Sequence, residues 1–98
     1  MDEPLEFEEA KRLILEILDK KTNVAIRDRY TDHAEDRTVE RGVSTLECLA
    51  GLRAGRVVGR ELRNGTWRYR VEAAMVCIMV AFRSETEFVI VTAWRRED

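Results

Sequence analysis

The chain has few of the histidines and cysteines that usually hold zinc or form cross-links. It contains one histidine and two cysteines, Cys48 and Cys77, which stand far apart and form no Cys-x-x-Cys pair. Zinc sites and disulfide frameworks need several such residues at short, regular spacings, so the sequence indicates neither. Both cysteines fall in apolar stretches, and we expect them to be buried free thiols. We expect no metal and no cofactor.

A long apolar run is also missing. The longest run, Ala73 to Phe82, is too short to span a bilayer. The first residues, MDEPLEFEE, are acidic, whereas a secretory signal begins with basic residues. A chain of 98 residues is long enough for one domain with one thin core. We therefore expect a single domain over residues 1–98, located in the cytoplasm and without a membrane partner.

Lysine is absent after Lys21. Residues 1–21 hold seven acids and four bases, whereas residues 50–96 hold nine arginines and four acids. Guanidinium groups pair with carboxylates or phosphates in bidentate geometry and stack on planar groups, so this basic half indicates an anionic partner. The same arginines would also suit a solvated sheet face that the acidic half balances. Charge alone does not decide between the two interpretations.

The first helix is predicted from Pro4 to Lys20. Apolar residues recur there at helical spacing, Pro4 fits the first turn, and the outer face is acidic. After this helix, Val24 and Ile26 suggest a short extended piece.

Two capping boxes predict two further helices. Asp32 and Glu35 have the right spacing to open a short helix that ends at Arg41. Ser44 and Glu47 repeat the spacing and open a helix that ends at Gly55. The helices are therefore expected at about residues 4–54.

After residue 55 the apolar spacing changes from the helical period to alternation, which predicts a four-stranded antiparallel meander. The strands are expected at residues 56–62, 67–72, 75–83 and 88–95, and Asn64-Gly65 is a strong signal for a hairpin turn. Residues 75–82 are apolar on both sides, so this strand is predicted to be central, with Cys77 buried. The fold class is therefore α+β, with helices packed on a sheet at about residues 56–96.

The predicted helix at residues 32–41 has almost no apolar face, since it contains only two apolar residues. Helices are normally held by packing such a face. Its polar side places His33, Arg37 and Arg41 at four-residue spacing, which aligns an imidazole with two guanidiniums. The plainer interpretation is a solvated surface on which nearby acids neutralise the arginines.

One pattern runs from this short helix into the predicted sheet. It reads His33-x-x-x-Arg37-x-x-x-Arg41-Gly42-Val43-Ser44, then a short helix ending at Gly55, then a meander that contains Tyr69-Arg70 and closes on Val91-Thr92. The pattern covers about residues 30–94 and resembles the RelE/ParE toxin superfamily. The likeness is greatest to short RelE-like proteins near the MqsR-type messenger-RNA interferases.

The resemblance implies a barnase-like fold in which helices pack on one side of a four-stranded antiparallel sheet. It also implies RNA cleavage without a metal or, as in the ParE branch, action on DNA gyrase. The catalytic residues implied by the resemblance are His33 and Arg37 on the short helix and Tyr69 and Thr92 on two strands. Phosphates would be held by four arginines, Arg41, Arg68, Arg70 and Arg95. The lysines of several RelE-like nucleases have no counterpart in this chain.

Alternation limits this implied site. Tyr69 and Arg70 are adjacent in one strand, so at most one of them faces a cleft unless the strand bulges. Core packing is the competing interpretation for Trp67, Tyr69 and Trp94.

We expect an RNA-cleaving, toxin-like domain. Cleavage without a metal needs a base for the 2′-hydroxyl, cations for the anionic phosphorane and an acid for the leaving oxygen. A histidine, with an ordinary pKa of about 6.5, can serve as base or acid at neutral pH. The expected partners are RNA, either free or ribosome-bound, and an acidic antitoxin protein. The alternative is a non-catalytic interaction module that binds an acidic antitoxin segment or a gyrase-like protein.

Overall fold

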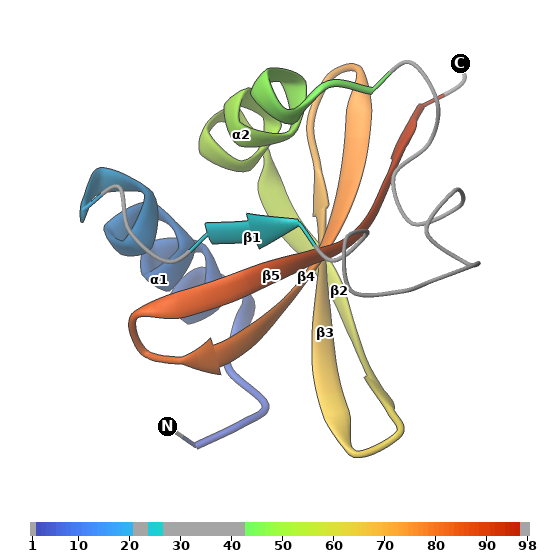
Figure 1. Cartoon of the computed structure of the whole chain (residues 1–98). Coiled ribbons are helices and arrows are strands. Elements are labelled where there is room, and N and C mark those ends of the chain that lie inside the picture. Colours follow the sequence, from blue (N-terminus) through green and yellow to red (C-terminus); the bar gives the residue numbers. More distant parts are fainter. Residues whose placement is uncertain (1, 21–23, 27–42, 97–98) are drawn as a thin grey trace.

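The computed structural model of the chain describes residues 2–20, 24–26 and 43–96 (Figure 1). Its elements are, in order, α1 (Phe7–Lys20), β1 (Val24–Ile26), α2 (Thr45–Ala54), β2 (Arg56–Arg63), β3 (Thr66–Glu72), β4 (Val76–Ser84) and β5 (Glu87–Arg95). The predicted α+β class is confirmed. The expected helix at residues 32–41 lies outside the described residues, and so do His33, Arg37 and Arg41.

Helix α1 begins at Phe7, so the expectation that Pro4 occupies its first turn is wrong. The first helical hydrogen bond runs from the Ala10 N–H to the Glu6 carbonyl, at 2.9 Å. The Glu9 carboxylate accepts the Glu6 N–H at 3.1 Å, which caps the helix one residue before Phe7.

Helix α2 has the predicted capping box at its start. The Ser44 hydroxyl accepts the Glu47 N–H, and the Glu47 carboxylate accepts the Ser44 N–H, both at 3.1 Å. The helix ends at Ala54, and Gly55 is its C-cap, as predicted. None of the described helices is long and apolar enough to cross a membrane.

The sheet has the strand order β1-β5-β4-β3-β2. Strands β2 to β5 form the predicted antiparallel meander, and β4 is flanked on both sides with Cys77 buried, as expected. Asn64 and Gly65 both have positive φ, 54° and 81°, which is the backbone that a two-residue hairpin turn requires. Strand β1 adds a fifth strand, parallel to β5, that the predicted sheet does not contain.

A β-bulge interrupts the alternation of side chains in β5. Thr92 pairs with Met79, whereas Ile90 pairs with Val80, so Val91 is an extra residue in this strand. An extra residue reverses the face on which all later side chains lie. A similar register shift occurs in β2, between Val57 and Gly59.

The core lies between the two helices and one face of the sheet (Figure 1). α1 contributes Ala10, Ile14, Ile17 and Leu18, and α2 contributes Cys48 and Leu52. The sheet contributes alternate residues of β3, β4 and β5: Tyr69, Val71, Val76, Ile78, Val80, Phe82, Phe88, Ile90 and Ala93. Burial of this apolar surface provides most of the driving force for folding.

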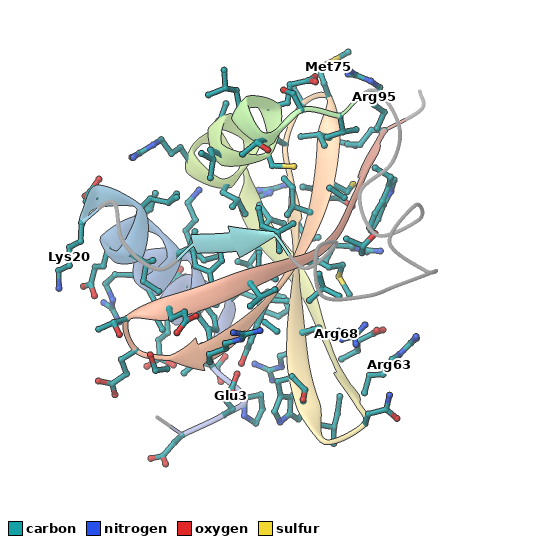
Figure 2. The ribbon with its side chains drawn as sticks, viewed as in Figure 1. Glu3, Lys20, Arg63, Arg68, Met75 and Arg95 are labelled. Atoms are coloured by element: carbon teal, nitrogen blue, oxygen red, sulfur yellow. The ribbon has the colours of Figure 1, made fainter. Side chains whose placement is uncertain are left out.

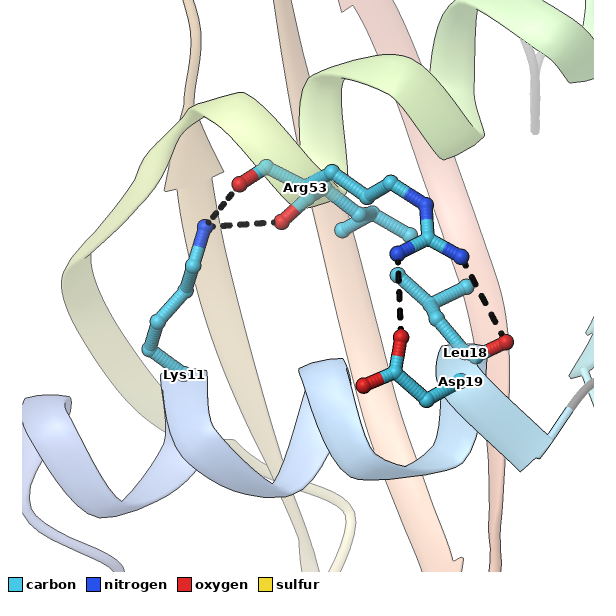
Figure 3. Close-up of polar contacts among 5 residues, drawn as sticks. Lys11, Leu18, Asp19 and Arg53 are labelled. Atoms are coloured by element: carbon cyan, nitrogen blue, oxygen red, sulfur yellow. Dashed lines mark hydrogen bonds and ion pairs between the residues drawn. The ribbon is translucent and has the colours of Figure 1, made fainter.

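Polar contacts join α1 to the end of α2 (Figure 3). The Lys11 ammonium group donates to the carbonyls of Leu52 and Arg53 at 2.9 and 2.8 Å, and also to that of Gly55. The Arg53 guanidinium reaches back to the Asp19 carboxylate at 3.2 Å. The last carbonyls of a helix lack intrahelical partners, so a cation at this position satisfies them.

Candidate nucleic-acid interface

The sheet has a second face, on the side away from the core. Nine side chains define this second face: Arg68, Arg70 and Glu72 of β3, Cys77, Met79 and Ala81 of β4, and Val89, Thr92 and Trp94 of β5. None of them belongs to the core cluster, and each alternates with residues that do. The charged members of this face all lie on β3, whereas Cys77, Ala81 and Val89 of β4 and β5 are buried.

Arg70, Met79 and Thr92 form a row across the second face. Arg70 is opposite Met79, and Met79 is opposite Thr92. Since neighbouring strands are about 4.8 Å apart, the backbones of Arg70 and Thr92 are about 10 Å apart. Arg68 shares this face and lies toward the β2–β3 hairpin, near Arg63 (Figure 2). The structure therefore brings together Arg68, Arg70 and Thr92 of the expected site.

A shallow hollow of about 190 Å³ lies beside Arg70. Gly59, Glu61 and Met79 are among the residues that line it. A Cβ atom at position 59 would have only the Arg70 Nε atom within 4 Å, at 4.0 Å, so the space beside Gly59 is open. An anionic group in the hollow would lie against the Arg70 guanidinium.

The arginines of this region form weak ion pairs with neighbouring carboxylates. Arg70 is 3.9 Å from Glu72, and Arg63 is 3.5 Å from Glu61. The side chains of Arg70 and Arg63 are 46% and 59% exposed, and exposed pairs of this kind contribute about 0–1 kcal/mol. A phosphate group, which binds arginine in bidentate geometry, can therefore compete with these carboxylates.

Tyr69 lies on the opposite face from Arg68 and Arg70. Its side chain is fully buried, and its ring packs against Phe82 with the centroids 5.4 Å apart. The hydroxyl donates to the Glu3 carboxylate and accepts the Leu5 N–H, both at 2.9 Å. Burial raises the pKa of Tyr69 to about 12, and the hydrogen bond to Glu3 also raises it. A proton donor must reach its substrate, so the expected catalytic role of Tyr69 has no support, and Tyr69 is a core residue.

Arg95 also lies away from the second face. It pairs with Val76, a core residue of β4, and its guanidinium makes two contacts to the Glu47 carboxylate, at 2.9 and 3.1 Å. A hydrogen bond from the Ser44 backbone and another from Arg95 lower the pKa of Glu47. Figure 2 shows Arg95 at the end of the molecule near α2, far from Arg68. The expected phosphate contact of Arg95 is thus separated from the row of Arg70 and Thr92.

Trp94 is a residue of the second face that sequence reasoning missed. Its interpretation as a core aromatic follows from uninterrupted alternation after Phe88 and Ile90. The bulge at Val91 reverses that alternation, so Trp94 lies on the second face, opposite Cys77. The apolar, β-branched run around Val91 gives no local signal for an extra residue.

Among the residues that the structure describes, no three histidine, cysteine or acidic side chains lie close enough to hold a metal ion.

Comparison of the chain with models of known protein families, with characterised proteins and with solved structures finds no match. The resemblance to the RelE/ParE superfamily therefore stays a prediction.

Proposed function

We propose that this chain binds RNA on the second face and cleaves it as a metal-independent endoribonuclease of the toxin type. The observation that carries the proposal is the convergence of Arg68, Arg70 and Thr92 on one sheet face. Arginines beside a shallow hollow suit a phosphate backbone, and Thr92 adds a hydroxyl that can hydrogen-bond to it. A RelE-like arrangement and an acidic antitoxin partner belong to the same proposal.

The cleavage step rests on His33 and Arg37, whose support comes from their spacing in the sequence. His33 takes the proton of the 2′-hydroxyl, and the resulting oxygen attacks the adjacent phosphorus. The bond from phosphorus to the 5′ oxygen breaks, and that oxygen receives a proton from solvent, to which His33 returns the proton it took. A 2′,3′-cyclic phosphate is left on the upstream fragment. Arg37 stabilises the negative charge of the phosphorane.

A second candidate function is a non-catalytic module that binds an acidic antitoxin segment or a gyrase-like protein. The ion pairs of the described arginines favour it. Five arginines already lie within 4 Å of carboxylates: Arg53 with Asp19, Arg63 with Glu61, Arg70 with Glu72, Arg83 with Glu87 and Arg95 with Glu47. Carboxylates of a partner could replace these in the same geometry.

His33→Gln separates the two candidates. This exchange of one polar side chain for another is expected to change stability by less than about 0.5 kcal/mol. If the chain is a nuclease, the variant loses growth arrest and RNA cleavage, because a general acid or base supplies about 10²–10⁴-fold in rate. Cleavage is measured by mapping RNA 5′ ends after the protein is induced in cells. Circular dichroism of the purified variant checks that it is folded.

Arg37→Ala should be similarly inactive, and the double variant little worse than either single one, because residues that act as a unit are not additive. Arg12→Ala, on the exposed side of α1, is the control for loss of an arginine. A folded His33→Gln variant that cleaves RNA at the original rate would disprove the catalytic assignment and favour the interaction module.

A further inference from the structure

Trp94 brings an aromatic ring to the second face. Its neighbour Ala93 is in the core, and its partner across the sheet is Cys77, which lies outside the core cluster. The other tryptophan, Trp67, packs against the core instead. The Trp94 side chain is only half-buried, so part of the indole is accessible.

Basic groups lie near this ring. Burial raises the pKa of the Cys77 thiol, and Glu72 raises it further, whereas Arg96 and Arg70 lower it. Glu72 pairs with Cys77, and Cys77 pairs with Trp94, so these three residues form one row of the second face. The guanidinium of Arg96, two residues beyond Trp94, donates to the Ala73 carbonyl at 2.7 Å. The cluster around the indole therefore consists of Glu72 in the same row, Arg96 two residues further along the chain, and Arg70 in the next row.

Thr92 and Met79 connect this cluster to the hollow beside Arg70. Thr92 lies two residues before Trp94 on the same face, about 7 Å away along the strand. Met79 is opposite Thr92 and also lines the hollow. A chain of nucleotides that crosses this row can thus contact an anion-binding group and an aromatic surface at successive positions.

We propose that Trp94 stacks an unpaired base of single-stranded RNA while Arg70 and Arg96 contact the adjacent backbone. The inference rests on the proposed RNA-binding function and adds to it the class of RNA, because a base inside a duplex cannot stack on a side chain. Stacking on an aromatic ring tolerates every base, so little sequence preference is expected at this position. The ring supplies affinity that phosphate contacts alone do not.

The competing role for Trp94 is structural, as a cover for Cys77 and for the end of β4. In that role the ring would stabilise the fold and make no difference between ligands. Two polyanionic ligands, one with bases and one without, distinguish the two roles.

The test uses a short, 2′-O-methylated single-stranded RNA, which cannot be cleaved through its 2′-hydroxyls, and inorganic polyphosphate. Trp94→Leu is expected to weaken binding of the RNA by about 5- to 150-fold and to leave binding of polyphosphate unchanged. Trp94→Phe, which keeps an aromatic ring, should restore part of the affinity. Arg70→Ala should weaken binding of both ligands, and Arg12→Ala neither.

Fluorescence of the unaltered Trp94 gives a second measurement that does not depend on how Trp94→Leu folds. In a Trp67→Phe protein the remaining indole emission comes from Trp94. We expect RNA, and not polyphosphate, to quench it.

Three results would overturn the inference. If Trp94→Leu keeps its RNA affinity while Arg70→Ala loses it, the stacking role is wrong and the RNA-binding function stands. If Trp94→Leu weakens RNA and polyphosphate equally, the ring has only a structural role. If the parent protein binds poly-glutamate as tightly as RNA, or binds no RNA, then the proposed function fails together with the inference.

Discussion

Tyr69 is a candidate catalytic residue in the sequence, but in the fold it stabilises the structure. Its hydroxyl joins the N-terminal segment to the sheet through Glu3 and Leu5, more than sixty positions away in the chain. Arg60 reinforces the same connection, because its guanidinium donates to the Leu5 carbonyl at 2.6 Å and lies 5.5 Å from the centre of the Phe7 ring. The segment before α1 is thus held by two side chains of the sheet.

Tyr69→Phe should lower the free energy of unfolding by about 1–2 kcal/mol at neutral pH, since it leaves the partly buried Leu5 N–H without its acceptor. The pKa of Tyr69 is raised in the folded protein from 10.0 to about 12. A raised pKa stabilises the folded state below pH 10, and this contribution is lost as the pH rises from 10 to about 12. Urea unfolding across this range should show a steeper loss for the parent protein than for Tyr69→Phe. Parallel curves would contradict the assignment.

At the scale of elements, a cation of α1 binds the carbonyls at the C-terminal end of α2, where the helix dipole is negative. Lys11 is the residue responsible, and partial burial lowers the pKa of its ammonium group. The contact spans about forty positions of sequence, so it orients two helices that share only a small part of the core.

Lys11→Met keeps most of the aliphatic stem and removes the charge. We expect it to lower the unfolding free energy by about 1–2 kcal/mol, because the carbonyls of Leu52 and Arg53 lose their donor. Arg12→Met, one position further along on the exposed side, is the matched control and should change stability by less than about 0.5 kcal/mol. Equal stabilities of the two variants in thermal unfolding would show that the Lys11 contacts are energetically neutral.

At the scale of the whole molecule, the net charge is −2, yet the proposed ligand is a polyanion. Binding must then depend on the local field of the second face and its short-range arginine contacts. Such contacts release counterions, so affinity falls steeply as salt rises.

For single-stranded RNA, the plot of log affinity against log salt should have a slope of about −0.7 for each phosphate contacted. Arg70→Ala is expected to reduce the magnitude of this slope by about 0.7, whereas Arg12→Ala leaves it unchanged. Fluorescence anisotropy at several salt concentrations makes the comparison. A flat salt dependence in the parent protein would exclude the arginine face as the binding surface.

The amino-acid sequence by itself determined the features that depend on near neighbours in the chain. The Ser44–Glu47 capping box, the Asn64-Gly65 turn, the four antiparallel strands and the central position of β4 all follow from patterns within a few residues. Of the candidate site, alternation alone correctly separated Tyr69 from Arg70.

Only the tertiary structure decided which residues share a face. The parallel pairing of β1 with β5, the contacts of the Tyr69 hydroxyl and the bond between Arg95 and Glu47 join positions far apart in the chain. The bulge at Val91 has the largest effect on the candidate site, because it places Thr92 and Trp94 on the same face as Arg70 instead of in the core. Its position is set by the pairing of β5 with β4 and by the packing of Ile90 and Ala93, and local sequence encodes neither.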